Sequence, residues 1–129
     1  MLAVDTNVLV RLLANDDSKQ ALVVVRLFQK EPIWISKTVL LETEWVLRSA
    51  YSFVPSRIQV ALTGLLGLPN ASVEDPATVA QALQWMAEGL DFADALHLAA
   101  SRRLGSFATF DQKLAKHCHL LGLDARLLT

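Results

Sequence analysis

The stretch MLAVDTNVLV, residues 1–10, decides the fold of this chain. A short apolar run ends at Asp5, and apolar side chains with helical spacing follow at once. This order predicts a strand, a tight polar turn and a helix, with one carboxylate at the carboxyl end of the strand. Ligands of open α/β sheets bind at that edge. Asp5 is therefore the first candidate functional residue.

The rest of the chain repeats this alternation. Four more strands, apolar or rich in β-forming residues, are expected at 33–36, 71–73, 106–110 and 125–128. Helices are expected at about 7–13, 18–30, 38–51, 54–66, 77–88, 90–100 and 112–119. Alternating strands and helices predict parallel pairing with right-handed crossovers. We expect an α/β fold: one domain over residues 1–129, a three-layer α/β/α sandwich with a short parallel sheet of four or five strands.

The composition excludes several classes of protein. Hydrophobic residues make up 53% of the chain, yet no apolar run reaches the roughly 18 residues of a membrane span. The N-terminus lacks the basic region of a signal peptide. The single cysteine, Cys118, excludes an internal disulfide and fits a small core residue in a reducing compartment. We expect a cytoplasmic protein that does not associate with membranes.

The net charge argues against strong nonspecific binding to nucleic acid. Lys and Arg number 12 and Asp and Glu number 13, which leaves a net charge of −1. A local basic rim around an acidic centre remains compatible with this value. Clustered acids can be neutralised by a bound metal ion, so the net charge does not describe such a site.

Three further carboxylates occupy places comparable to that of Asp5. Asp111 follows the strand at 106–110, and Asp94 opens a helix that is apolar almost all round and therefore buried. In the helix at 38–51, one face carries positions 38, 41, 42, 45, 46 and 49. That spacing places Glu42 inside the apolar stripe. It places Glu44 outside the stripe, in a solvated pair with Arg48.

Each acid alone has a simpler explanation. Asp5, Asp91 and Asp111 can cap helices, Asp94 suits a helix dipole, and a buried Arg or Lys can pair with Glu42. Taken together, the four carboxylates project to one end of a parallel sheet. Two carboxylates about 5 Å apart repel by roughly 3 kcal/mol at an effective dielectric of about 20, so four together call for a cation.

Oxygen ligands of this kind suit Mg²⁺ or Mn²⁺. No cluster of cysteine and histidine indicates zinc. His117 and His119 point apart on a helix, and we expect both at the surface.

Four motifs in this order resemble the PIN domain family, and in particular the VapC toxins of type II toxin–antitoxin systems. The motifs are VDTNVL at 4–9, VLLE at 39–42 with WVL at 45–47, DFADALHLA at 91–99 and TFD at 109–111. The resemblance implies a PIN-like α/β/α fold and a metal-dependent endoribonuclease. It assigns Asp5, Glu42, Asp94 and Asp111 as the acidic quartet. It also implies a cognate antitoxin protein and a homodimer.

The expected roles follow from this interpretation. Asp5, Asp94 and Asp111 would bind the metal directly or through water, and Glu42 would orient the metal-bound water or hold a second ion. Supporting residues are Thr6, Asn7, Thr109 and Asp91, the last as a helix cap or an outer ligand. Weaker candidates for RNA contacts are Arg11, Arg48 and Lys113. Ordinary capping explains Thr6, Asn7 and Thr109 equally well and is the first interpretation of Asp91. Solvated side chains are the favoured explanation of Arg11, Arg48 and Lys113.

Other functions also place an aspartate after the first strand. A phosphatase of the haloacid dehalogenase type needs a second Asp two residues later, where this chain has Asn7. A receiver domain needs an acidic pair in its first turn and a phosphorylatable Asp in mid-chain, and neither is present. A non-catalytic PIN-like module that binds RNA or protein stays open, although all four acids are present. A stand-alone RNA-processing nuclease also stays open.

Overall fold

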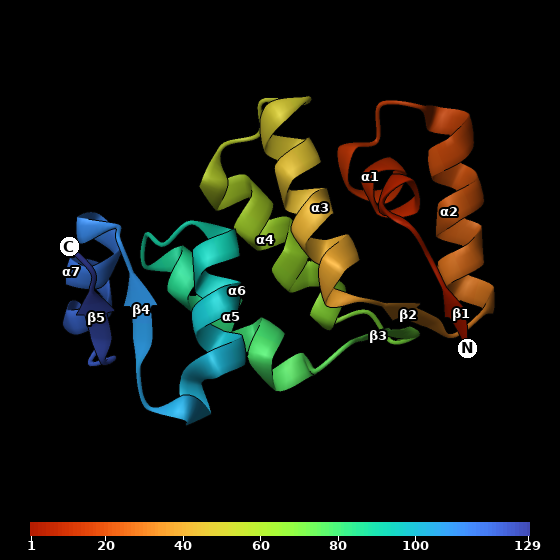
Figure 1. Ribbon diagram of the computed structural model, residues 1–129. Helices are drawn as coiled ribbons and strands as arrows, with labels where there is room; N and C mark the ends of the chain where they lie inside the picture. Colours follow the sequence, from red (N-terminus) through yellow and green to blue (C-terminus); the bar gives the residue numbers. More distant parts are fainter.

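The computed structural model describes all residues from 1 to 129, and every predicted strand and helix is present (Figure 1). The longest helices have 13 residues, and none is both long and apolar enough to span a bilayer. In chain order the elements are β1 (Leu2–Ala3), α1 (Thr6–Ala14), α2 (Ser18–Lys30), β2 (Ile33–Ile35), α3 (Lys37–Ser49), α4 (Pro55–Leu66), β3 (Ala71–Val73), α5 (Pro76–Ala87), α6 (Phe92–Ser101), a 3₁₀ turn (Arg102–Leu104), β4 (Phe107–Thr109), α7 (Gln112–Leu120) and β5 (Ala125–Leu127).

The strands form two parallel sheets rather than one. β1, β2 and β3 pair in that order, and β4 pairs with β5 alone. Figure 1 shows the two sheets on opposite sides of the molecule, with helices between them. The α/β architecture and the parallel pairing are confirmed, whereas a single sheet of four or five strands was wrong. Strands of two or three residues offer few ladder hydrogen bonds, so helix packing decides where they lie.

Polar residues before the helices explain where the helices begin. The side chains of Asp5, Ser36 and Asp111 accept hydrogen bonds from backbone N–H groups three residues on, at 3.3, 3.2 and 3.0 Å. These bonds satisfy donors that the first helical turn leaves free. Pro55 and Pro76 start α4 and α5, where the missing N–H of proline costs nothing.

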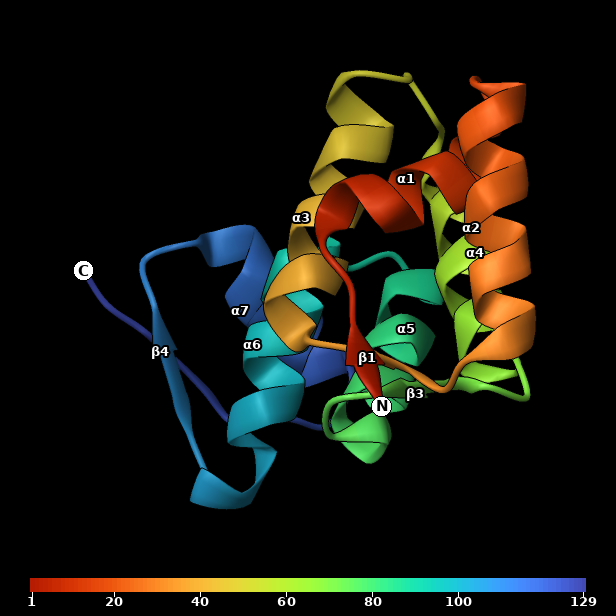
Figure 2. The ribbon, with the colours of Figure 1, turned by 90° about the vertical axis from the view of Figure 1, so that its right-hand side faces the viewer.

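Helix α1 lies between α2 and α3, as both views show (Figures 1 and 2). Its buried residues Leu9 and Val10 belong to the packed face of this three-helix arrangement. At the other end of the molecule Cys118 is fully buried in α7, which confirms it as a core residue. The contact of α1 with α3 brings the turn after β1 beside α3, and the candidate site begins there.

The buried face of α3 differs from the predicted one. The buried residues are Leu40, Thr43, Glu44 and Leu47, which recur at positions i, i+3, i+4 and i+7. Trp45, which the predicted stripe included, is 57% exposed. Apolar residues occupy both faces of this helix, so local spacing favoured the wrong one. The helices that surround α3 in the fold decided which face was buried.

One substitution on each face of α3 tests this orientation of the helix. We expect Leu47→Ala to lower the free energy of unfolding by about 2–5 kcal/mol, because it leaves a cavity in the core. The matched change Trp45→Ala should cost about 1 kcal/mol or less, because most of that ring faces water. Urea denaturation measures both values. A larger loss for Trp45→Ala would restore the face predicted from the sequence.

Candidate functional site

The first two predicted acids lie where α1 meets α3. Asp5 follows β1, is exposed, and caps α1 through one carboxylate oxygen. The hydroxyl of Thr6, which is 8% exposed, donates a hydrogen bond to the Oε1 atom of Glu42 on α3. Thr6 was predicted to support Asp5, and the structure shows it orienting Glu42 instead. Asn7 is exposed on the first turn of α1 and forms no side-chain hydrogen bond.

A second group of acids lines one cavity between the start of α6 and the start of α7. Asp91, Asp94 and Asp111 share this cavity of ≈ 210 Å³ with Lys113 and His117. Asp91 caps α6 by accepting a hydrogen bond from the backbone N–H of Asp94 at 3.3 Å. Asp111 caps α7 in the same way, and its own N–H donates to the Thr109 hydroxyl at 3.0 Å. Asp91 and Thr109 therefore form hydrogen bonds at the starts of α6 and α7, and their supporting roles stay a prediction.

The cavity carries excess negative charge. The pKa of Asp94 is raised, first because the carboxyl is partly buried and next because the charge of Asp91 lies nearby. His97 opposes this rise in pKa, and Asp111 adds to it. Burial removes water that would stabilise the charged carboxylate, and the like charges nearby destabilise it further. A cation or a neighbouring basic group would relieve this repulsion.

The two groups of acids do not combine into a metal site in this structure. No set of three or more Asp, Glu, His or Cys side chains lies close enough to hold an ion. Carboxylate oxygens suit a hard divalent cation in type. Their spacing does not assemble a coordination sphere. The structure brings Asp94 and Asp111 together and places Asp5 and Glu42 in the other group, so the metal-binding roles of all four stay a prediction.

Comparison with known proteins places the chain in a family. Residues 2–120 match the family described as PIN domain. The chain belongs to the PIN domain family. This membership confirms the resemblance carried by its four motifs. No curated protein matches the chain.

One solved structure is similar to this PIN domain over most of both chains. It is the crystal structure of Mycobacterium tuberculosis VapC20, described as a sarcin-ricin loop cleaving toxin. The two chains are 22% identical, with a TM-score of 0.45. The match covers 90% of this chain and 94% of that one.

The two glutamates of α3 exchange the environments predicted for them. Glu44 is only 3% exposed, and the Nε atom of Arg48 donates to it at 2.8 Å. Glu42, predicted to lie in the apolar stripe, is exposed. The hydrogen bond with Glu44 raises the pKa of Arg48, and the nearby charge of Asp91 adds to this rise. Arg48 therefore has a partner within the PIN domain, and an RNA contact by it stays a prediction.

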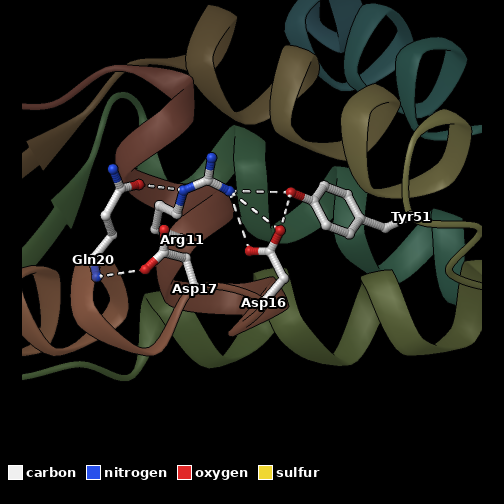
Figure 3. A network of polar contacts seen from close by, with 5 residues as sticks. All are labelled: Arg11, Asp16, Asp17, Gln20 and Tyr51. Atoms are coloured by element: carbon white, nitrogen blue, oxygen red, sulfur yellow. Dashed lines mark hydrogen bonds and ion pairs between the residues drawn. The ribbon is translucent and has the colours of Figure 1, made fainter.

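Arg11 is also held by groups of the same chain (Figure 3). Its Nη1 atom lies 3.1 Å from a carboxylate oxygen of Asp16 and 3.1 Å from the hydroxyl of Tyr51. Tyr51 in turn donates to Asp16 at 2.7 Å, and this bond is the main cause of the lowered pKa of Asp16. The Nε atom of Arg11 donates to Gln20. This network ties the α1–α2 turn to the end of α3, which explains Arg11 without RNA.

His117 is the site residue that the sequence analysis missed. It was expected at the surface, and it is half-buried on the wall of the acidic cavity. Its imidazole also packs near Gly89, where an added Cβ would lie 3.4 Å from Cε1. The sequence did contain a signal for this position. His117 follows Lys113 by four residues, which places both side chains on one face of α7. His119, on another face, is exposed as expected.

The exchange of glutamate environments predicts opposite effects on stability. We expect Glu44→Gln to lower the free energy of unfolding by about 1–2 kcal/mol, because it weakens a charged hydrogen bond in a buried position. Glu42→Gln keeps an oxygen acceptor for Thr6 and should change stability by about 0.5 kcal/mol or less. Both variants are compared by urea denaturation. Equal losses would contradict the burial that separates the two side chains.

The raised pKa of Asp94 predicts a pH-dependent gain in stability on its removal. Because the pKa of Asp94 is higher in the folded than in the unfolded protein, the protonated carboxyl favours the folded state. The free energy of unfolding is therefore highest below the unfolded-state pKa, and it falls as pH rises through the folded-state pKa. In metal-free buffer, Asp94→Asn should therefore be more stable than wild type at pH 7. The difference should disappear below the ordinary carboxyl pKa of 3.8. Thermal melts across pH measure this, and a variant less stable than wild type at pH 7 would contradict the repulsion.

Proposed function

We propose that this PIN domain is a ribonuclease that hydrolyses phosphodiester bonds at the cavity between α6 and α7. One observation carries this proposal: three carboxylates and two basic side chains surround the same cavity. A phosphodiester needs positive charge on its oxygens, and its hydrolysis needs a group that activates water. Another cavity, of ≈ 480 Å³ and lined by residues including Leu12, Val25 and Phe28, has no titratable residue and offers neither.

The proposed cofactor is Mg²⁺ or Mn²⁺. When bound, such an ion lowers the pKa of a coordinated water and stabilises charge on the phosphate. The support for it is the motif match and the type of donor: Asp91, Asp94 and Asp111 line the cavity with carboxylate oxygens, which such an ion prefers. The motif match adds Asp5 and Glu42 to the residues proposed to bind the ion.

The side chains of the chain then have distinct proposed roles. Lys113 is a compact positive charge on the cavity wall and would bind a non-bridging phosphate oxygen. His117, half-buried beside it, would donate a proton to the leaving oxygen. Asp91 positions Asp94 by capping the helix on which Asp94 lies. Thr109 positions Asp111, and Thr6 positions Glu42.

We further propose that the protein is the toxin of a toxin–antitoxin pair and acts as a homodimer. The four motifs that resemble VapC toxins support this assignment. A stand-alone RNA-processing nuclease is the second candidate, because it would need the same cavity and the same acids. A neighbouring gene for a small DNA-binding protein would favour the toxin assignment. The test is expression of the PIN domain in cells: a toxin should arrest growth, and co-expression of the neighbouring protein should relieve the arrest.

Cleavage of RNA by the purified protein tests the proposed activity. We expect cleavage with Mg²⁺ or Mn²⁺ and none with EDTA. Asp94→Asn should lower the rate by more than about 100-fold, since even loss of an outer partner of a metal costs 10–100-fold. Glu31→Gln, an exposed acid at the end of α2, is the control and should cleave like wild type.

Binding of the ion can be measured without cleavage. An Mg²⁺ concentration of about 100 times its Kd should raise the free energy of unfolding of wild type by about 2.7 kcal/mol. Asp94→Asn should show a smaller rise. Cleavage that persists in EDTA, or an undiminished rate for Asp94→Asn, would overturn the proposed metal chemistry.

A further inference from the structure

Helix α1 is attached to α3 and the turn after it by polar bonds at two points. Near the start of α1, the hydroxyl of Thr6 donates a hydrogen bond to Glu42 on α3. Near its end, the Nη1 atom of Arg11 donates to the hydroxyl of Tyr51 at 3.1 Å, just beyond the end of α3. Arg11 lies five residues after Thr6, which is about 7.5 Å further along a helix. The first point includes a residue of the proposed site, and the second includes none.

The second attachment is a closed ring of three polar groups (Figure 3). Tyr51 donates to Asp16 at 2.7 Å, and the Nη1 atom of Arg11 that donates to Tyr51 also lies 3.1 Å from Asp16. The hydrogen bond with Tyr51 is the largest cause of the raised pKa of Arg11 and of the lowered pKa of Asp16. Each of the three groups therefore interacts with the other two, and the hydroxyl of Tyr51 bonds to both.

Tyr51 is itself held in place relative to α3. Its half-buried ring packs against the core and meets the ring of Phe53 edge to face, with the ring centroids 6.2 Å apart. The backbone N–H of Phe53 donates to the carbonyl of Leu47 on α3 at 3.0 Å, which closes the turn after this helix. The hydroxyl of Tyr51 is therefore a fixed point at the end of α3, and Arg11 connects α1 to it.

The side of α1 that faces α2 is loosely filled. Two hollows border it: one of ≈ 290 Å³ is lined by Asn7, Val8 and Arg11 of α1, and one of ≈ 480 Å³ by Leu12 of α1. Apolar packing has no preferred direction, and empty space supplies no atoms that oppose a shift of the helix. A helix attached only at Thr6 would be free to pivot about that point, and a second attachment prevents this.

We propose that Arg11, Asp16 and Tyr51 form a clamp that holds α1 on α3 and thereby positions Glu42 for the proposed hydrolysis. They are positioning residues, since none of them lines the acidic cavity. This inference rests on the proposed ribonuclease activity. A tilt of α1 would move the hydroxyl of Thr6 away from Glu42, and a displacement of about 1 Å can cost as much as 100-fold in rate.

The carboxyl ¹³C resonance of Glu42 tests the clamp without any cleavage, in metal-free buffer. Thr6→Val removes the hydrogen bond to Glu42 and gives the reference value for its loss. Tyr51→Phe keeps the ring and removes only the hydroxyl, and it should move the Glu42 resonance most of the way to that reference. Arg11→Met should do the same from the α1 side. The double variant should add little, because both changes break one ring of bonds.

Cleavage kinetics measure the consequence for activity. Tyr51→Phe should lower kcat about tenfold or more and leave the KM for RNA unchanged, because lost positioning acts on the reaction step rather than on substrate binding. Asp16→Asn keeps an oxygen acceptor for the hydroxyl of Tyr51 and should retain most of the rate. In a Glu42→Gln background, Tyr51→Phe should have little further effect, because it acts through Glu42.

Asn70→Ala is the matched control for a general loss of stability. The side-chain amide of Asn70 donates to the carbonyls of Phe28 and Gln29 at 3.1 and 3.2 Å, so it also joins distant segments, but it involves neither α1 nor α3. This variant should lower the free energy of unfolding in urea as Tyr51→Phe does. Its Glu42 resonance and its kcat should match those of wild type.

The outcomes separate this inference from the proposed function. If the protein cleaves RNA, and folded Tyr51→Phe keeps the wild-type kcat or the wild-type Glu42 resonance, the clamp is wrong and the activity stands. If wild type cleaves no RNA, the proposed function fails, and the Glu42 resonance of Tyr51→Phe still decides whether the clamp holds Glu42. If Asn70→Ala shifts this resonance as far as Tyr51→Phe does, the effect is a general loss of stability and the inference is wrong.

Discussion

The acids of this domain depend on one recurring interaction, a carboxylate that caps a helix. Asp5, Asp91 and Asp111 each accept a hydrogen bond from the first turn of the helix that follows. The cap occupies one oxygen of each carboxylate and orients the side chain against the helix end. The second oxygen forms no hydrogen bond within the chain. A residue in this position can therefore stabilise the fold and still offer a ligand atom at the end of a strand or turn.

The acidic cavity lowers the stability of the fold. Asp94 is partly buried near Asp91 and Asp111, and its pKa is raised first by this burial and then by the charges of these neighbours. A fold selected only for stability would place a cation or an amide at this position. Lys113 and His117 on the same wall offset part of the charge and leave the cavity open. The repulsion is consistent with a cavity that binds a cation or a phosphate, because binding would relieve it.

The hydrogen bond between Thr6 and Glu42 explains how two distant motifs contribute to one place. The two residues are 36 positions apart, and they meet because α1 packs on α3. Arg48, on the other side of α3, is held by Glu44 and lies within electrostatic reach of Asp91. Helix α3 therefore contacts the turn after β1 through one face and approaches α6 through another. This helix connects the two groups of acids, although they do not join into one metal site.

The sequence by itself determined the positions of the strands and helices, the capping acids and the family. Those features depend on neighbours three or four residues apart, such as the apolar spacing of residues 18–30 or the Asp before α1, α6 and α7, so they can be derived locally. Only the tertiary structure decided that Glu44 is buried and Glu42 exposed, that His117 and Asp94 line the same cavity, and that β4 and β5 pair apart from β1–β3. Each of these outcomes depends on which helices pack together. The face of a helix with apolar residues on both sides, and the partner of a three-residue strand, are chosen by long-range contacts that no local pattern contains.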